Sequence, residues 1–532
     1  MALSRRALYG FPPPQPPSST HTVRMVPLTQ GVRLDTAWPL QVPGSSISMT
    51  NFIPLEGKLI PRSRLSSINT IRGLNAAYGM TEFIYSSQFG QAVVWYSAAS
   101  THAIVLSTGS ISKASFVSAG GLGVADLEDQ QGGWQYAVAF GENLGVGENM
   151  LVAAGSSYDT LLCLYQQGGT SAGAAVYSYL TSAPKAVAVC AFDNYVLAFN
   201  TSAGAAFVTR VQWCVRGEPF NWTGEGSGFE DLLEMSGVGM AVRGMSDGRV
   251  ILFSDREIWY GIRAAYPAQF QFYPLDKSVG CCAPRTIADV PGGLLFLSTD
   301  WRLCLLPAGG GPAQRIAPHV AEWLRRRASV DSVQGTWGLY DPYLNTYTLY
   351  IEKSGTITEA LVLNLGTGEA GFLAFTFGQA PWAGVGLGTT LASNYFGKSE
   401  GVLFADSTGT VYSTNSTLAY DSSSVETQVV TSTWRSAPIA TDLAGGWKQI
   451  LDVNVDYQAT SRATVVLRMA ADGNTFETTG QSISLASAPI VGRAKGEVYT
   501  GGYAPVVELY STSTGYELHR LDVTMNLGGR RV

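Results

Sequence analysis

The sequence predicts an all-β protein: a β-propeller of about seven blades, with six and eight also compatible, followed by a β-sandwich. Three observations carry this prediction. Apolar strand pairs recur along the middle of the chain, stretches with the 3.6-residue apolar period of helices are nearly absent, and the C-terminal part alternates strictly between apolar and polar residues. The 60 glycines among 532 residues, about one in nine, also favour short strands joined by tight turns.

Composition excludes several classes of protein. Hydrophobic residues make up 46% of the chain and charged residues only 14%, which excludes a disordered chain and a coiled coil. The net charge of −6 provides no global attraction for nucleic acid. We expect no membrane span, because no stretch has 18 consecutive apolar residues, and no signal peptide, because the start has no apolar core. The chain is therefore expected to be made in the cytoplasm.

Residues 1–75 are predicted to form an extended, proline-rich arm and strap. The tract from Phe11 to Pro17 favours the polyproline conformation, which has no internal hydrogen bonds. Further prolines and scattered apolar residues follow it. Two readings remain open: a strap across its own domain, or an arm that docks on a neighbouring subunit and becomes ordered there.

Residues 76–420 contain the repeat that predicts the propeller. Each unit is an apolar strand, a short polar turn and a second apolar strand. The seven strand pairs are 92–97 with 102–107, 150–155 with 160–165, 194–199 with 205–213, 249–254 with 257–262, 293–298 with 301–306, 346–351 with 359–365, and 401–406 with 409–414. A period of roughly 50 residues with two clear strands, and space for two weaker ones, is typical of a four-stranded propeller blade.

One helix is expected, over residues 318–328. Pro318 suits the first helical position, and Val320, Trp323 and Leu324 have the spacing of an apolar face. Three arginines follow in its last turn: Arg325, Arg326 and Arg327. They complement the helix dipole there, and contact with DNA or an acidic partner is the functional alternative.

Residues 425–532 are predicted to form an antiparallel β-sandwich, after a linker near 420–424. Alternating strands such as 447–459 and 462–473, with a hairpin turn at 471–474, support this.

The sequence offers no catalytic constellation, so we predict that the protein is not an enzyme and has no metal site or cofactor. It has four scattered histidines, no nucleophile elbow and no phosphate-binding loop. The acids Glu230, Asp231 and Glu234 are close in sequence, but such clusters are common on surfaces. The string from Ser298 to Trp301 departs from the aspartate box of propeller hydrolases. The six cysteines lie in or beside apolar segments and are read as buried free thiols.

The tryptophans allow a different function, that of a carbohydrate-binding or host-receptor-binding propeller adhesin. Aromatic side chains on loops would form platforms for sugars, whereas aromatic side chains in strands favour the core. The residues in question are Trp95, Trp134, Trp213, Trp222, Trp259, Trp301, Trp337 and Trp382. Their positions in strands favour packing.

Several segments, taken in order, resemble tail proteins of short-tailed bacteriophages. Residues 51–62 resemble an opening with Asn51, Gly57 and Arg62, and residues 210–213 with 217–222 are similar to a second segment, in which Cys214 replaces a serine. Residues 250–259, 280–287, 293–300 and 316–320 continue the series. In order and spacing they look like the tail nozzle or hub proteins of podovirus-type phages, also called tail tubular protein B, over roughly residues 50–350.

The resemblance implies a structural protein of the virion tail. In such proteins six copies form a ring below the adaptor ring that sits on the portal, and fibres or spikes attach at its flank. Genomic DNA passes through the lumen on ejection without specific binding. An acidic chain with few basic clusters suits such a conduit, because each neutralised phosphate would add affinity and drag.

Overall fold

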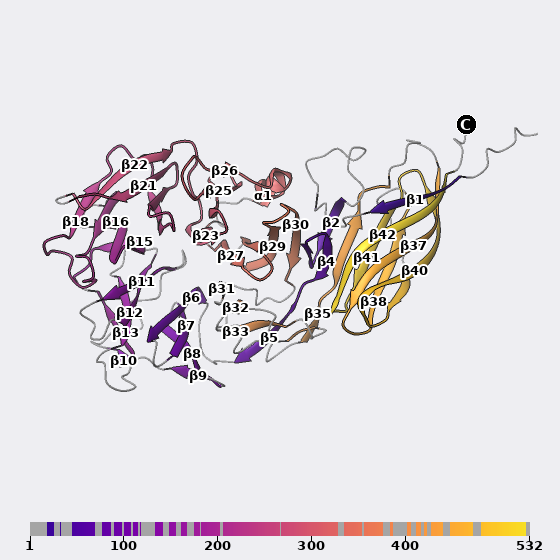
Figure 1. The fold of residues 1–532 in the computed structure, drawn as a ribbon, viewed down its shortest axis with the longest axis horizontal. Coiled ribbons are helices and arrows are strands. Elements are labelled where there is room, and N and C mark those ends of the chain that lie inside the picture. Colours follow the sequence, from indigo (N-terminus) through magenta and orange to yellow (C-terminus); the bar gives the residue numbers. More distant parts are fainter. Residues whose placement is uncertain are drawn as a thin grey trace, which may run out of the picture.

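The computed structural model describes most of the 532-residue chain. The described residues are 19–25, 32, 45–69, 77–86, 90–97, 101–107, 110–114, 117–118, 134–141, 148–155, 161–166, 175–180, 182–202, 206–265, 268–327, 333, 335–353, 356–375, 383–386, 402–405, 411–415, 420–422, 427–439, 447–471 and 480–527. They form two units side by side along the long axis, a propeller and a sandwich (Figure 1).

Seven small sheets arranged in a ring form the propeller, as the repeat predicts. Blade one contains β6 (Ala77–Ser86), β7 (Gly90–Ser97), β8 (Thr101–Ser107) and β9 (Ser110–Ala114). Blade two contains β11 (Trp134–Gly141), β12 (Glu148–Gly155), β13 (Leu162–Gln166) and β14 (Ala175–Tyr179), with β10 (Val117–Ser118) parallel to β14. Blade three contains β15 (Lys185–Phe192), β16 (Tyr195–Ser202), β17 (Ala206–Trp213) and β18 (Gly228–Asp231). Blade four contains β19 (Gly239–Gly244), β20 (Val250–Ser254), β21 (Ile258–Arg263) and β22 (Phe270–Asp276).

The last three blades complete the ring. Blade five contains β23 (Ala288–Val290), β24 (Gly293–Leu297), β25 (Leu303–Pro307) and β26 (Gln314–Arg315), and a short 3-10 helix, η5 (Pro284–Thr286), precedes it. Blade six contains β27 (Trp337–Asp341), β28 (Thr346–Lys353), β29 (Thr356–Asn364) and β30 (Ala370–Ala374). Blade seven contains β31 (Ala383–Gly386), β32 (Val402–Ala405), β33 (Val411–Asn415) and, from the N-terminal region, β5 (Arg64–Asn69). On the far side of β5 the sheet adds β34 (Tyr420–Ser422) and β35 (Thr427–Val429).

The predicted strand pairs are the two middle strands of each blade. Neighbouring blades cover both faces of these strands, which is why they appear in the sequence as continuous apolar runs. Every residue of β20 is buried, and so are the first seven of β28. The first and last strands of a blade are shorter or more exposed; β26 is exposed at both residues.

Apolar clusters between neighbouring blades hold the propeller together. The rings of Phe253 in blade four and Phe296 in blade five meet edge to face, with centroids 5.1 Å apart. Tight turns fix the register inside a blade. Between β15 and β16 the turn residues Asp193 and Asn194 have φ angles of 46° and 62°, the left-handed values that a two-residue hairpin of this kind needs.

The sandwich consists of two facing sheets over one core. The first sheet contains β3 (Phe52–Leu55), β4 (Lys58–Pro61), β42 (Tyr516–Leu527), β37 (Lys448–Ala459) and β40 (Ala488–Gly502), and β1 (Ser19–Met25) also pairs with β42. The second sheet contains β2 (Ser46–Thr50), β36 (Ser432–Ser436), β41 (Val506–Ser511), β38 (Ala463–Ala470) and β39 (Gln481–Leu485). Fully buried Trp434, Val453, Leu509 and Leu521 lie in the cluster between them.

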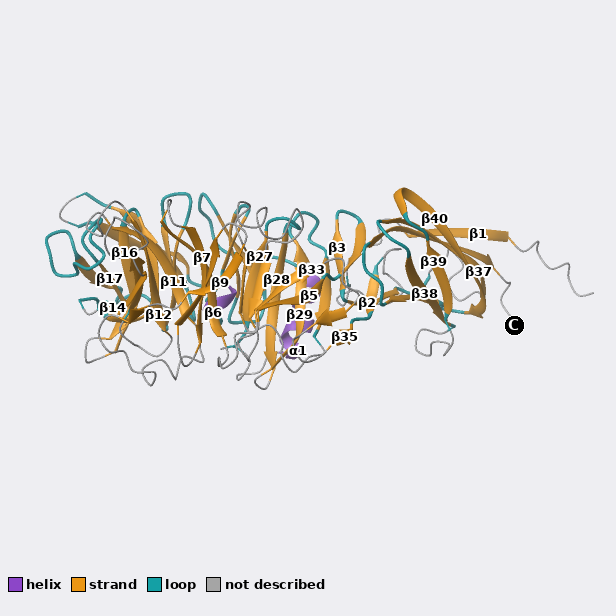
Figure 2. Cartoon of the chain, turned by 90° about the horizontal axis from the view of Figure 1, so that it is seen from below, coloured by secondary structure: helices purple, strands orange, loops and turns teal. Residues whose placement is uncertain are grey.

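The two units share hydrogen-bonded sheet. Strand β2 pairs with β30 of blade six on one side and with β36 of the sandwich on the other, so nine strands form one continuous sheet. Figure 2 shows the propeller and the sandwich in line, with β2 and β3 between them.

The N-terminal region differs from the extended arm expected over residues 1–75. Its described part contributes β1 to β4 to the sandwich and β5 to the propeller, all on its own chain. Residues 1–18, which contain the proline tract, lie outside the described residues.

Candidate functional site

The hydrogen bonds that join the propeller to the sandwich converge on Asn51, between β2 and β3. Its backbone N–H donates to the carbonyl of Phe372 at 2.7 Å, and its side-chain oxygen accepts the N–H of Ala374 at 2.9 Å. Its side-chain nitrogen donates to the carbonyl of Thr431, also at 2.9 Å. One asparagine therefore bonds to blade six and to the segment that begins the second sheet of the sandwich.

Two further groups complete this junction. The carbonyl of Asn51 accepts the N–H of Arg62 at 2.8 Å and the hydroxyl of Ser432 at 2.9 Å. The side chain of Arg64 is fully buried beside it, and its guanidinium donates to the carbonyls of Arg62 and Val430, both at 3.0 Å. A buried guanidinium with five donors in a fixed plane holds several backbone segments in one arrangement.

The predicted helix is present and packs next to the junction. Helix α1 (Ala321–Arg327) follows a 3-10 turn, η6 (Pro318–Val320), and both Val320 and Leu324 are fully buried. The ring of Trp323 stacks on Phe372 of β30 with centroids 4.3 Å apart. The helix is thus fixed to blade six by the apolar face that the sequence indicates.

The three arginines of α1 form ion pairs on the protein itself. Arg325 and Arg326 share Glu322, at 3.6 and 3.1 Å. Arg327 pairs with Glu359 of β29 at 2.5 Å, and its guanidinium lies 3.8 Å from the centre of the Trp323 ring.

A polar hollow of about 280 Å³ lies beside α1, lined by Arg326, Arg327, Ile351, Lys353, Thr358 and Glu359. Two carboxylates, Glu322 and Glu359, offset part of the positive charge of the three arginines and Lys353. The remaining excess is small and exposed, so it attracts anions weakly and is screened by salt. Contact of Arg325, Arg326 and Arg327 with DNA or a partner stays a prediction.

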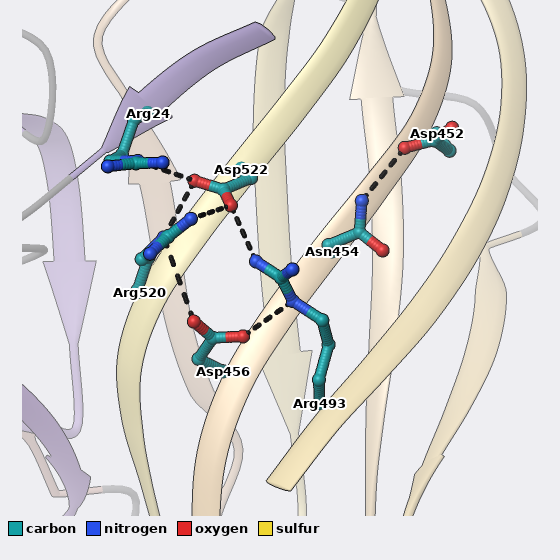
Figure 3. Close-up of polar contacts among 7 residues, drawn as sticks. All are labelled: Arg24, Asp452, Asn454, Asp456, Arg493, Arg520 and Asp522. Carbon is teal, nitrogen blue, oxygen red and sulfur yellow. Dashed lines mark hydrogen bonds and ion pairs between the residues drawn. The ribbon is translucent and has the colours of Figure 1, made fainter. Parts of the chain in front are cut away.

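A second group of charges crosses the outer face of the first sandwich sheet (Figure 3). Asp522 on β42 is its centre: it accepts hydrogen bonds from Arg520 and, at 2.7 Å, from Arg493 of β40, and Arg24 of β1 lies 3.6 Å away. Asp456 on β37 accepts a second bond from Arg493 at 2.8 Å. The network therefore ties β1, β42, β37 and β40 together across the sheet.

The electrostatics of this network favour the charged form of Asp522. The hydrogen bond from Arg520 is the largest cause that lowers the pKa of the Asp522 carboxyl, and the charges of Arg493 and Arg24 act in the same direction. Burial opposes them. Asn454 in the same view donates to Asp452 at 3.0 Å, and Lys495 lies 3.6 Å from that carboxylate.

The acids singled out in the sequence do not form a paired-carboxylate site. Asp231 accepts two hydrogen bonds from Arg210, at 2.6 and 2.8 Å, while Glu230 and Glu234 are exposed. Asp300 accepts the Ser298 hydroxyl at 2.5 Å, which is a turn contact. Within the described ranges, no group of three or more histidine, cysteine, aspartate or glutamate side chains could hold a metal ion.

All six cysteines are buried and free, as predicted. Burial is the largest cause that raises the pKa of Cys190 to about 12 and that of Cys282 to about 12. Thiols with raised pKa values are poor nucleophiles at neutral pH because little thiolate is present.

Of the eight tryptophans considered above as sugar platforms, the structure describes the side chains of five. Trp213, Trp222, Trp259 and Trp337 are buried, Trp301 is half-buried, and the side chains of Trp95, Trp134 and Trp382 lie outside the described residues. Trp447 and Tyr503 on the sandwich are both exposed, and their rings meet edge to face with the centroids 5.4 Å apart.

Sequence reasoning did not predict the roles of Asn51, Arg64 and the charges on the sandwich. Their partners lie hundreds of residues away in the chain, such as Thr431 for Asn51 and Val430 for Arg64. The one local signal was the asparagine between two short strands, because asparagine tolerates the left-handed backbone seen there, with φ of 59°.

In the part of the chain that the structure describes, no helix has the length and apolar character needed to span a bilayer.

Comparison with known proteins gives no family assignment for this chain. No protein-family model matches the sequence, and no curated protein matches it either. Among solved structures, the chain is similar to a catalytically inactive virginiamycin B lyase from Staphylococcus aureus, with 10% identity, a TM-score of 0.39, and coverage of 66% of this chain and 98% of that one. It is also similar to YCF48 from Cyanidioschyzon merolae (9% identity, TM-score 0.37, 66% and 99% covered) and to an exo-beta-1,3-galactanase from Phanerochaete chrysosporium (9%, 0.30, 88% and 100%). At these identities and scores, the likenesses carry no argument about activity.

Proposed function

We propose that this chain is a non-catalytic structural subunit of the tail of a short-tailed bacteriophage. Six copies would form a ring below the adaptor ring, with tail fibres or spikes at the flank, and genomic DNA would pass through the lumen. The protein would be made in the host cytoplasm and reside in the virion.

The observation that supports this proposal most is the hydrogen-bonded joint between the two units. Nine strands continue from blade six through β2 into the sandwich, and the buried Asn51 and Arg64 bond to backbone groups on both sides of it. Asn51 and Arg62 belong to the opening that resembles the phage tail proteins, and both take part in this joint. A ring that carries pressure and passing DNA needs subunits whose parts do not move relative to one another.

Charge supports the same reading. A conduit must not hold DNA, since each phosphate neutralised by lysine or arginine adds affinity through counterion release. The net charge is −6, and the arginines of α1 are already paired with Glu322 and Glu359.

Native mass spectrometry and negative-stain imaging of the purified protein, alone and with its adaptor and fibre partners, test the proposal. We expect a six-fold ring with a central pore. A protein that stays monomeric with all of these partners would overturn it.

One observation favours a second candidate, a carbohydrate-binding adhesin. Trp447 and Tyr503 are 40% and 44% exposed on the sandwich, where aromatic rings can stack on sugars. A glycan array tests this candidate. A hit that is lost in Trp447→Ala and kept in Trp434→Phe, a change in the buried core, would favour the adhesin.

A further inference from the structure

The stretch from Phe220 to Val238, which includes the outer strand β18 of blade three, exposes several apolar side chains. Leu233 is 90% exposed, Phe229 56%, Val238 41% and Phe220 37%, all within one stretch between β17 and β19. We call these four residues, with Glu230 and Glu234, the blade-three flank. Single exposed apolar residues are common, whereas exposed apolar residues that gather on one surface are typical of sites that bind a partner.

This stretch has a defined conformation despite its exposure. The indole N–H of buried Trp222 donates to the carbonyl of Pro219 at 2.8 Å, and the N–H of Gly224 donates to the Asn221 side chain at 2.9 Å. These local bonds fix the loop that carries Phe220. A surface already held in one conformation loses little entropy when it binds.

The exposed Phe229 ring is also held in place. The guanidinium of Arg210 lies between Phe207 and Phe229, 3.7 and 4.2 Å from the two ring centres. Asp231 fixes that guanidinium through two hydrogen bonds. Phe229 therefore presents a constant face to solvent.

The charge of the flank selects its partner. Glu230 and Glu234 are exposed and form no ion pair with any residue that the structure describes. The positive charge of Arg210 is already matched by Asp231. Arg256 is exposed beside Gly237 and offsets part of the negative charge, so the surface is apolar with a small acidic excess, and it fits a partner segment that is apolar and basic.

Residues 1–18 of this chain have that chemistry. Arg5 and Arg6 supply two positive charges, and Leu8, Tyr9 and Phe11 supply apolar and aromatic surface. The prolines that follow favour an extended conformation, which costs little entropy to dock.

The place where this segment joins the molecule indicates which flank it reaches. Strand β1 begins at Ser19, at the end of the sandwich away from the propeller, whereas β18 lies on the far side of the propeller (Figure 1). Eighteen extended residues span at most about 60 Å. An arm that starts at one end of the elongated molecule is placed to reach a copy beyond that end, so that each copy gives one arm and receives one, as a heterologous ring contact requires.

We propose that residues 1–18 of one copy bind the blade-three flank of a neighbouring copy. The identity of that neighbour rests on the ring proposed above, whereas the recognition of the arm by the flank does not.

A labelled peptide of residues 1–18, titrated into the full chain and followed by fluorescence anisotropy, tests the recognition. The receptor carries Arg5→Glu and Arg6→Glu, so that its own arm does not compete. We expect saturable binding that weakens as salt rises. A second receptor carries Glu230→Lys and Glu234→Lys and keeps its natural arm. It should bind the peptide at least about tenfold more weakly than the first receptor does. That receptor should regain binding with a peptide that carries Arg5→Glu and Arg6→Glu.

Matched controls separate the flank from general effects. Glu56→Lys changes an exposed charge in the β3–β4 turn and should leave peptide binding unchanged. Leu233→Ser should weaken binding because it removes apolar surface without changing the charge, whereas Ile490→Ser, at a residue that is 81% exposed on the sandwich, should not. Rescue by the charge-reversed peptide would show that the flank variant is folded.

The outcomes distinguish this inference from the ring itself. Absent binding, or equal binding to all receptors, overturns the arm contact, and the ring still stands if native mass spectrometry shows six copies of the natural protein. Specific binding by a protein that stays monomeric with its partners supports the recognition and overturns the ring.

Discussion

Replacement of Asn51 by alanine should uncouple the propeller from the sandwich. The change removes both side-chain bonds of Asn51, one to the N–H of Ala374 and one to the carbonyl of Thr431. The change also places alanine at a φ of 59°, in the left-handed region that alanine tolerates less well than asparagine does. Both effects act at a position that is only 5% exposed, so water does not replace the lost partners freely.

The size of the effect follows from these losses. Each buried group left without a partner costs about 1–3 kcal/mol, and the left-handed backbone costs alanine about 1 kcal/mol more. With two groups left unpaired, the sum is a loss of roughly 3–7 kcal/mol for opening of the junction. Asn51→Gly loses the same bonds without the backbone penalty and should be about 1 kcal/mol less harmful.

Hydrogen exchange followed by mass spectrometry reads out this junction directly. A loss of about 3 kcal/mol accelerates exchange through local opening by roughly 100-fold in β30 and β36. Asn200→Ala is the matched control, since Asn200 is also buried, has a φ of 57° and donates to the carbonyl of Gly239, but lies within the propeller. Unchanged exchange of β30 and β36 in Asn51→Ala would refute the reasoning.

Three further results are expected. The lowered pKa of Asp522 means that its ionised form stabilises the folded state. The contribution of Asp522 to the protection of β1 against exchange, about 1–2 kcal/mol, should therefore be present at neutral pH and be lost as the pH falls through the folded pKa. Asp522→Asn should lose this contribution already at pH 7, and protection that does not change with pH would contradict the role of the network. Leu324→Ala should lower the free energy of unfolding, measured with a chemical denaturant, by about 2–4 kcal/mol because it opens a cavity between α1 and blade six. Arg326→Ala, at an exposed side chain, should change the same free energy by no more than about 0.5 kcal/mol. Equal effects of the two changes would argue against the packing described. A thiol reagent such as DTNB should label none of the six cysteines in the native protein and all six after denaturation. Fast labelling of the native protein would show that these thiols are not buried.

The sequence predicts the propeller because burial on both faces gives its middle strands a distinct pattern. Strands β20 and β28 are apolar throughout, and their spacing indicates the blades. The first and last strands carry a weaker signal; β18 is half or fully exposed along its length and resembles a loop in sequence. Strand β5 was not predicted because its partner β33 is far away in the chain.

The candidate site shows the same division. The apolar face of α1 and the pairing of Arg326 with Glu322 lie within one helix, so spacing alone indicates them. The partner of Arg327 is Glu359, on another strand, and nothing local identifies it. The junction at Asn51 depends on bonds across more than 300 residues, which only the folded chain brings together.

The pairing of the first strands with the last imposes an order on biosynthesis. Strand β1 adds to β42 with partners such as Thr20 and Asn526, which are 506 positions apart, and β5 waits for β33. A ribosome that adds about 5–20 residues per second needs roughly 25–100 s to supply those partners. During this interval β1 and β5 have no partner strand to pair with. They stay soluble only if chaperones bind them or if their own tendency to aggregate is low. Translation products that end before β33 would lack the closure of the seventh blade, and products that end before β37 would lack the long central strands of the first sandwich sheet.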